Sequence, residues 1–219
     1  MEILSLVIDF FLNLDVYLSA WVNQYGMWVY ALLFCIVFAE TGFVVTPFLP
    51  GDSLLFVAGA LAAIGSEGMN IGWLLLVLCS AAILGNTLNY HIGRFLGPKV
   101  FQWENSRFFN KNALLKTQEF YERHGGKTLV ISRFLPIFRT FAPFVAGVGS
   151  MKYSRFVMFN VTGGLGWCFS LTLAGYWFGN IEWVRSNLSL LVVGIILVSL
   201  LPLLIVWLMR DKEGEEKKA

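Results

Sequence analysis

No lysine or arginine occurs in the first 93 residues of this 219-residue chain, and all 16 basic residues lie from Arg94 onward. A secretory signal peptide carries basic residues ahead of its apolar run. Because the chain starts Met1-Glu2-Ile3, we expect no cleaved signal peptide. The formal net charge of +2 therefore describes the protein poorly, since the two parts of the chain differ strongly in charge.

Cysteine and histidine are also scarce. Cys35, Cys79 and Cys168 are far apart in apolar sequence, with no Cys-x-x-Cys spacing, and the chain has only two histidines. This excludes a disulfide framework and the usual zinc-ligand patterns, and neither histidine belongs to a recognisable nucleophile and base arrangement. We therefore expect packing cysteines, no metal, no cofactor and no catalytic residue. A membrane enzyme that acts on lipid phosphates is disfavoured for the same reason.

What the chain has in abundance is apolar sequence. Hydrophobic residues make up 57% of it, and the mean hydropathy is +0.68. Such a composition places a chain of this length in the membrane as a single domain of a few spans. We predict an all-α polytopic membrane protein with no nucleic-acid partner.

The apolar runs and the positive-inside rule give a predicted topology. The first half is predicted to have an outer interfacial helix at 1–25, a re-entrant hairpin at 27–65 and a span at 71–95 that Gly97-Pro98 ends; for 1–25 a tilted span is the alternative. A basic amphipathic segment at 99–125 should lie on the inner face. The second half is predicted to have a re-entrant hairpin at 127–150, spans at 153–179 and 188–209, and a cytoplasmic tail at 210–219. Residues 66–69 should face outward, and the C-terminus should face the cytoplasm.

The two hairpins are predicted from their prolines. Residues 27–65 are too many for one span of about 20 residues, and proline breaks a helix interior. The expected breaks are Pro47, Pro50 and Gly51 in the first hairpin, and Pro136 and Pro143 in the second. Since one hairpin would enter from outside and the other from inside, the halves form two inverted repeats, which is a common plan of transporters.

Each hairpin carries two charges of one sign near its break: Glu40 and Asp52 in the first, Arg133 and Arg139 in the second. A charge at the bilayer centre costs about 2.5–3.5 kcal/mol on insertion scales, so these side chains should meet each other or line a watery cavity. The planar fork of arginine suits phosphate, and buried carboxylates are candidate proton carriers. Structural ion pairs alone remain the simpler alternative.

Several phrases, in this order and spacing, resemble the bacterial DedA family. They are Glu40-Thr41-Gly42, Phe48-Leu49-Pro50-Gly51-Asp52-Ser53-Leu54, Tyr90-x-x-Gly93-Arg94-x-x-Gly97, His124-Gly125-Gly126, Arg133-Phe134-x-Pro136-x-x-Arg139 and Pro143-Phe144-Val145-Ala146-Gly147. The likeness covers roughly residues 20 to 210. It implies a multi-pass protein of the bacterial inner membrane, related to the eukaryotic VTT-domain lipid scramblases.

The resemblance also implies a function and its residues. It implies return of undecaprenyl phosphate or another phospholipid across the membrane in dependence on the proton gradient. The family's functional acids fall on Glu40 and Asp52, which would bind substrate and couple protons, and its functional arginines fall on Arg133 and Arg139. Asn86 replaces an aspartate of many members, which puts any extra proton step there in doubt. A proton-coupled small-ion transporter is the alternative, and assembly of several copies is compatible with either.

Overall fold

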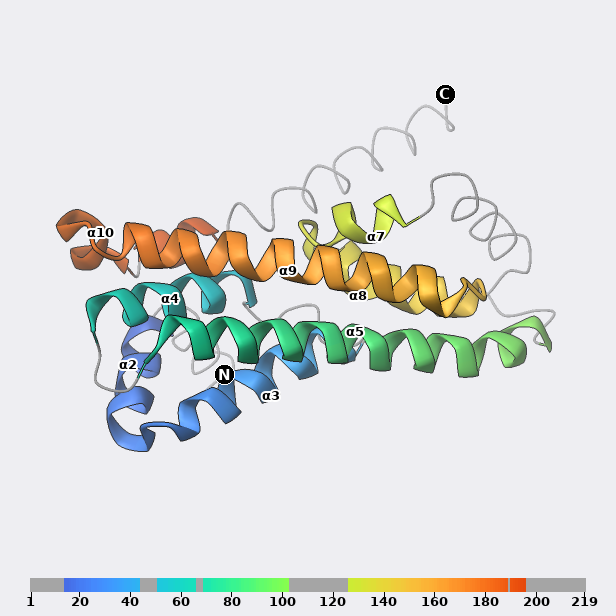
Figure 1. Ribbon diagram of the computed structural model, residues 1–219, viewed down its shortest axis with the longest axis horizontal. Helices are drawn as coiled ribbons and strands as arrows, with labels where there is room; N and C mark the ends of the chain where they lie inside the picture. The colour runs from blue at the N-terminus through green and yellow to red at the C-terminus, as the bar shows by residue number, and fades with distance from the viewer. Residues whose placement is uncertain (1–13, 44–50, 66–68, 103–125, 189, 196–219) are drawn as a thin grey trace, which may run out of the picture.

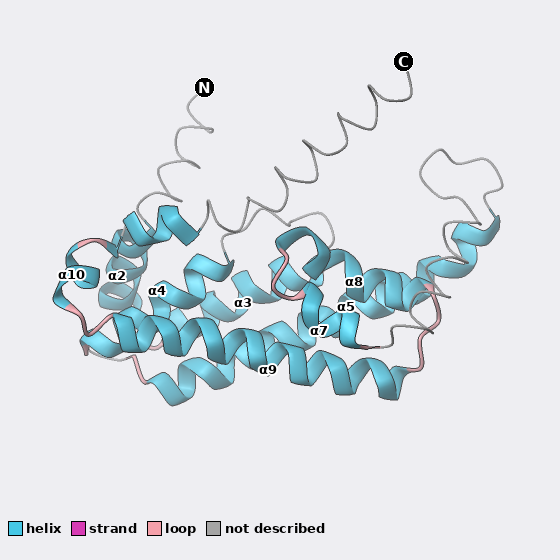
Figure 2. Ribbon diagram, turned by 90° about the horizontal axis from the view of Figure 1, so that it is seen from above, coloured by secondary structure: helices cyan, strands magenta, loops and turns pink. Residues whose placement is uncertain are grey.

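The computed structural model describes residues 14–43, 51–65, 69–102, 126–188 and 190–195. Every regular element in these ranges is a helix (Figure 2), which confirms the all-α prediction. The helices are α2 (Leu14–Tyr25), α3 (Trp28–Gly42), α4 (Gly51–Ile64), α5 (Ile71–Gln102), α7 (Lys127–Ser132), α8 (Pro136–Val148), α9 (Tyr153–Phe178) and α10 (Glu182–Ser186).

Two long antiparallel helices, α5 and α9, form the frame of the fold (Figure 1). Both contain an apolar stretch long enough to cross a membrane, Ile71–Gly97 in α5 and Tyr153–Phe178 in α9. At 1.5 Å per residue, a helix of about 20 residues spans the hydrocarbon core. The length and composition of these two helices are consistent with a membrane protein.

Gly97-Pro98 does not end the helix, because α5 continues to Gln102, although the apolar stretch within it ends at Gly97. Gly97 has a packing role instead of a capping role. A Cβ at this position would lie 3.2 Å from the Val148 carbonyl oxygen, so glycine allows the end of α8 to approach α5 closely.

The segments predicted to form the first hairpin are α3 and α4, which run in opposite directions beside the first half of α5 (Figure 1). The chain leaves α3 at Gly42, and α4 begins at Gly51. The predicted breaks at Pro47 and Pro50 lie outside the described residues. With 15 and 14 residues, each arm is shorter than the roughly 20 residues that a full crossing needs.

The segments predicted to form the second hairpin are α7 and α8, and the interruption between them lies directly before Pro136, not at Pro143. The helix is interrupted between Ser132 and Pro136, where Leu135 is extended, whereas Pro143 lies inside α8. Pro136 is tolerated at the start of α8 because the first helical N–H needs no partner in the helix. Pro143 removes the helical hydrogen bond that would reach the Arg139 carbonyl, but it does not end the helix. The predicted break at Pro143 is therefore wrong.

Each hairpin sends its second arm onto the long helix of the other half. The most extensive contacts of the fold are those of α8 with α5, α3 with α5, and α4 with α9. A Cβ at Gly59 would overlap the Thr172 carbonyl oxygen, and one at Gly147 would overlap the Tyr90 carbonyl oxygen. Glycine thus permits backbone contact of α4 with α9 and of α8 with α5, as small residues do between membrane helices. The two interfaces are built alike.

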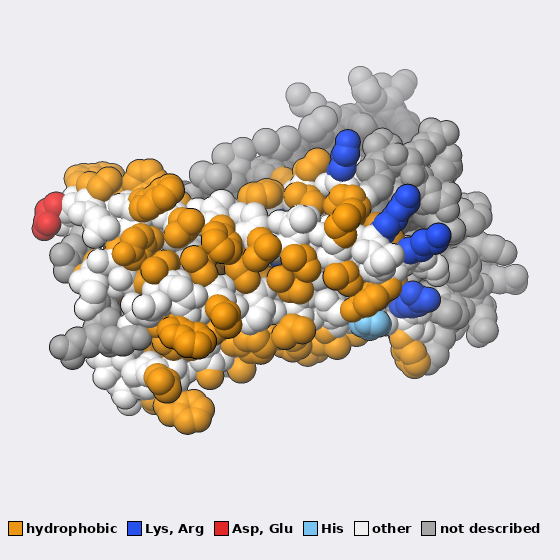
Figure 3. Space-filling view, in the orientation of Figure 1, with side chains coloured by type: hydrophobic (Ala, Val, Ile, Leu, Met, Phe, Trp, Pro, Cys, Tyr) orange, Lys and Arg blue, Asp and Glu red, His pale blue; other side chains and the backbone are white. Residues whose placement is uncertain are grey.

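The surface of the described part is apolar along its length and charged at its ends. Figure 3 shows hydrophobic side chains over the middle, lysine and arginine at one end and an acidic side chain at the other. The exposed basic residues whose side chains the structure describes are Arg94, Lys127, Lys152 and Arg155. Such an apolar belt between polar ends fits a lipid bilayer.

This charge distribution gives a prediction of orientation. Lys152 and Glu182 precede and follow the span α9, and both are exposed. With Cys35 replaced by serine, we expect Lys152→Cys to react with an impermeant thiol reagent only from the cytoplasmic side. Glu182→Cys should react only from outside. Labelling of Glu182→Cys from the cytoplasm alone would mean that the topology is the reverse of the predicted one. Cys79 and Cys168 are buried, so we expect them to remain unlabelled.

Candidate functional site

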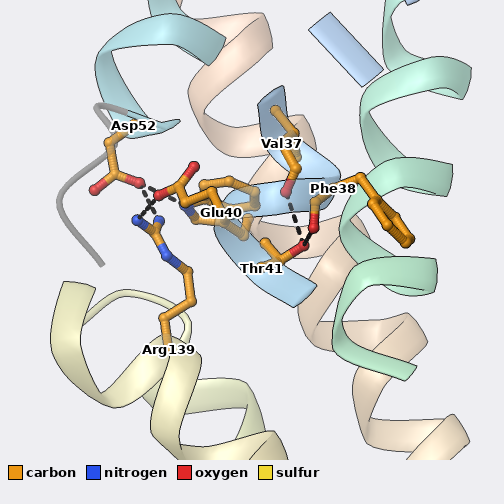
Figure 4. Close-up of polar contacts among 7 residues, drawn as sticks. Val37, Phe38, Glu40, Thr41, Asp52 and Arg139 are labelled. Carbon is orange, nitrogen blue, oxygen red and sulfur yellow. Dashed lines mark hydrogen bonds and ion pairs between the residues drawn. The ribbon is translucent and has the colours of Figure 1, made fainter. Parts of the chain in front are cut away.

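Three of the four predicted charges meet at the breaks of the two hairpins. Arg139 Nη2 donates to Glu40 Oε1 at 2.6 Å, and Arg139 Nη1 donates to Asp52 Oδ1 at 2.5 Å (Figure 4). The Glu40 and Arg139 side chains are 0% and 3% exposed, whereas that of Asp52 is 17% exposed. One guanidinium therefore bridges two carboxylates from the other hairpin.

The sequence places Glu40 inside by its helical spacing. The buried residues of α3 include Val29, Leu33, Val37 and Glu40, which share one face of a 3.6-residue period. Glu40 lies in the last turn of α3, where the helix dipole is unfavourable for a carboxylate. Arg139 compensates this charge across the hairpins.

The other two members come from helix starts. Asp52 is in the first turn of α4, where the helix dipole favours a negative charge. Arg139 follows the N-terminal Pro136 of α8 by three residues, so the break in the second hairpin fixes the direction of its side chain. Both positions depend on the chain breaks that the sequence predicts near them.

Trp167 of α9 completes the site, and the sequence analysis did not identify it. Its indole Nε1 donates to Asp52 Oδ1 at 2.8 Å, and Arg139 Cζ lies 4.7 Å from the ring centroid, a distance typical of a cation–π contact. Trp167 is 1% exposed. A possible signal was its spacing of seven residues from Asn160, which puts both on the same face of α9.

Asn89 of α5 ties the two hairpins together. Its Nδ2 donates to the carbonyl oxygens of Thr41, at 3.2 Å, and Thr140, at 2.8 Å. These residues directly follow Glu40 and Arg139, and Asn89 is fully buried. A single amide thus holds the backbone next to both partners of the buried ion pair. Sequence reasoning missed this residue too.

Arg133 does not join the ion pair as expected. Its Nη2 donates to Asn160 Oδ1 at 2.5 Å and to the Asn160 carbonyl at 3.3 Å. Among the described residues no carboxylate forms an ion pair with it, although it is 1% exposed. Asn160 is held in turn by α5, since its Nδ2 donates to the Ile83 carbonyl and to Thr87 Oγ1. The expected set of two acids against two arginines is therefore split.

Several buried polar atoms of the helices lack a partner within the described part of the chain. They are Glu40 Oε2, Asn86 Oδ1, Asn89 Oδ1, Arg133 Nη1, Arg139 Nε and Thr172 Oγ1. Buried polar groups normally form hydrogen bonds, and an unsatisfied group points to water or to a ligand. Both buried arginines and Glu40 therefore have an atom that can still form a hydrogen bond.

A largely apolar cavity of about 420 Å³ opens beside this site. Its lining consists of Asp52, Phe134, Trp167, Leu171, Leu191, Gly194 and Ile195. The volume is in the usual range of small-molecule sites, which combine an apolar wall with a few polar groups. Asp52 and Trp167 are the members that link the cavity to Arg139. Among the described residues no cluster of His, Cys, Asp and Glu could hold a metal.

Comparison with known proteins gives consistent matches. Residues 49–177 match the model of the VTT domain. The chain is 54% identical over 202 residues to Protein DedA of Escherichia coli K12, covering 92% of both chains. It is 42% identical over 188 residues to the uncharacterized membrane protein Rv0364 of Mycobacterium tuberculosis H37Rv, covering 84% of this chain and 82% of the relative.

A more distant relative is the inner membrane protein YqjA of Escherichia coli K12. It is 37% identical over 160 residues, which cover 72% of this chain and 70% of the relative. No solved structure shows a significant match.

Proposed function

The chain belongs to the DedA family of VTT-domain membrane proteins, and on this premise we propose that it moves a lipid phosphate across the bacterial inner membrane. The substrate is undecaprenyl phosphate or another phospholipid, and movement is coupled to protons. The inner membrane is the location named for the relative YqjA. We propose translocation without bond cleavage, with the C-terminus in the cytoplasm.

One observation carries this proposal: the Arg139 ion pair lies at the polar end of an otherwise apolar cavity. Asp52 contacts Arg139 at 2.5 Å and also lines the cavity. A lipid phosphate has the same two parts, an anionic head and a hydrocarbon tail. Arginine binds phosphate oxygens through two parallel N–H groups, and apolar walls accommodate the tail.

The mechanism begins with competition for Arg139. In the described state both of its terminal nitrogens are occupied by Glu40 and Asp52, so a phosphate must displace a carboxylate to bind these two nitrogens. A proton on Glu40 cancels the charge that attracts the guanidinium. Protonation of Glu40 and phosphate binding at Arg139 therefore favour each other, which couples the two movements.

Arg133 supplies a second positive charge near the path. It lacks a carboxylate partner among the described residues, and its Nη1 is unsatisfied. An unpaired buried charge is costly, and an anionic headgroup would lower that cost. We propose that Arg133 receives the phosphate on its way to or from Arg139.

The hairpins support movement of the site between the two sides. Their arms are too short for a full crossing, and their second arms contact the long helices through similar glycine interfaces. We propose that the two halves are inverted repeats with re-entrant hairpins whose breaks lie inside the bilayer. Rocking of such repeats is a general route to alternating access.

Filling the cavity tests lipid transport against small-ion transport. A Cβ at Gly194 meets nothing within 4 Å, and this residue lines the cavity. We expect Gly194→Trp to lower lipid-phosphate transport in proteoliposomes by about tenfold, because the indole occupies space that the tail requires. Proton flux through a small-ion transporter would not depend on this space.

Gly166→Trp is the matched control, since Gly166 also meets nothing within 4 Å and is not part of the cavity lining. It should transport like the wild type. Normal lipid transport by Gly194→Trp would show that the cavity does not take part in the mechanism. Clear proton or cation flux without movement of any lipid would favour the small-ion transporter.

Gly51 gives a second test of the site. A Cβ at this position would overlap Glu40 Oε2, and Glu40 has no free space because it is fully buried against Arg139. Gly51→Ala should push the carboxylate away from Arg139 and lower transport by about tenfold or more, since a charged hydrogen bond contributes about 1.5–3 kcal/mol. Transport assays with Gly166→Ala as control measure the effect. Wild-type transport by Gly51→Ala would contradict the packed geometry.

A further inference from the structure

Asp52 Oδ1 is the meeting point of two donors from different helices. It accepts Arg139 Nη1 of α8 at 2.5 Å and Trp167 Nε1 of α9 at 2.8 Å. The two donors also contact each other, with Arg139 Cζ 4.7 Å from the indole centroid. The guanidinium and the indole N–H thus point at one position that an anionic oxygen occupies.

The donors are fixed, whereas the acceptor is the most accessible member of the group. Trp167 is 1% exposed and Arg139 is 3% exposed. Arg139 is held from the other side by Glu40. Asp52 has a 17% exposed side chain, begins a helix next to the hairpin break, and faces the cavity. An oxygen that replaces Asp52 Oδ1 would enter from the cavity.

We propose that Trp167 is the second hydrogen-bond donor of the anion site, after Arg139. We further propose that the Asp52 carboxylate occupies this site when no substrate phosphate is bound. A phosphate oxygen of the lipid takes the position of Asp52 Oδ1 and accepts hydrogen bonds from Arg139 Nη1 and Trp167 Nε1. This inference rests on the proposed function and adds a specific binding residue to it. Asp52 returns to both donors when the lipid leaves, which expels the headgroup.

The chemistry of the indole supports this exchange. Trp Nε1–H is a donor only, and a buried donor without a partner destabilises the site. Replacement of one oxygen anion by another keeps Trp167 satisfied in both states. Its ring also keeps Arg139 in place during the exchange, because a cation–π contact does not depend on which anion is bound.

Direct binding of farnesyl phosphate to the purified full chain tests the proposal by calorimetry in detergent. Asp52→Asn removes the competing charge and should bind farnesyl phosphate about tenfold more tightly than the wild type, although it does not transport. Asp52→Asn with Trp167→Phe should lose about tenfold relative to Asp52→Asn alone, because phenylalanine keeps an aromatic ring beside Arg139 and lacks the N–H. Trp177→Phe, a 69% exposed position of the same helix, is the control and should change nothing.

The outcomes separate this inference from the proposed function. Tighter binding by Asp52→Asn that is insensitive to Trp167→Phe would overturn the role of Trp167 and leave the function standing. Equal affinities of wild type and Asp52→Asn would overturn the role of Asp52 as a substitute. No binding to the wild type or to any variant would contradict the proposed function itself.

A measurement on the wild type keeps the proposal testable if Trp167→Phe fails to fold. Trp167 is 1% exposed, whereas Trp28, Trp73, Trp177 and Trp183 are 60–75% exposed, so among these five we expect its indole N–H to exchange most slowly with solvent. In a protein labelled with ¹⁵N-tryptophan, this slowly exchanging signal should shift with farnesyl phosphate and stay in place with farnesol. A signal that ignores farnesyl phosphate would contradict the proposal.

Discussion

Arg139→Ala should abolish transport of lipid phosphate in proteoliposomes. The variant removes the guanidinium that binds Glu40 at 2.6 Å and Asp52 at 2.5 Å, and it is the group that we expect to bind the phosphate. Without it the site presents two carboxylates to an anionic substrate. Like charges repel the headgroup, so the loss should reach at least about a hundredfold, or about 2.8 kcal/mol at tenfold per 1.4 kcal/mol.

The same variant should also destabilise the protein. Removal of one partner of a buried pair costs about 3–5 kcal/mol when the remaining charge stays dry, and Glu40 is 0% exposed. Water in the adjoining cavity would reduce this cost, so transport should fall further than the yield of folded protein. Arg155→Ala, at an exposed position, controls for loss of positive charge alone. Normal transport by Arg139→Ala would show that the hairpin breaks are not the site.

Glu40→Gln should uncouple transport from the proton gradient. Glutamine keeps an oxygen acceptor near Arg139 but cannot exchange a proton. If protonation of Glu40 frees Arg139 for phosphate, the variant should bind the headgroup at least as tightly as the wild type. Its lipid transport should then be the same with and without an imposed pH gradient. The measurement is the initial transport rate in proteoliposomes at several gradients.

Asp52 is the comparison for this prediction. It also contacts Arg139, but its side chain is 17% exposed and also accepts the Trp167 N–H. If Glu40→Gln still responds to the gradient like the wild type, Glu40 is not the proton carrier, and Asp52 becomes the candidate. A Glu40→Gln protein that loses headgroup binding would instead assign Glu40 a role in holding Arg139 in position.

The sequence predicted the charged part of the site because charge in apolar sequence is rare and costly. Glu40, Asp52 and Arg139 stand out for this reason, and the expectation that they meet came from the prediction of two hairpins whose breaks converge. The same reasoning paired Arg133 with the acids, and here it was wrong. Sequence spacing does not reveal that the Arg133 guanidinium donates a hydrogen bond to Asn160, which lies 27 residues further along the chain in α9.

The uncharged part of the site could not be predicted in the same way. Asn89 and Trp167 lie on long helices whose other residues are largely apolar, and tryptophan in such a helix usually suggests an interfacial anchor. Their roles depend on contacts with Thr41, Thr140 and Asp52, which only the packing of the helices brings about. Likewise, proline alone did not distinguish a break from a helix interior, because α8 begins at Pro136 but tolerates Pro143 in its interior.

Leaflet-resolved transport in proteoliposomes tests the central claim most directly. Undecaprenyl phosphate and common phospholipids are compared with and without a pH gradient, for the wild type and for Arg139→Ala. Our account predicts that the wild type moves a lipid phosphate between leaflets and that the gradient changes its rate. Arg139→Ala should not move the lipid, with or without the gradient. Failure to move any lipid, together with proton or cation flux that requires Arg139, would contradict it.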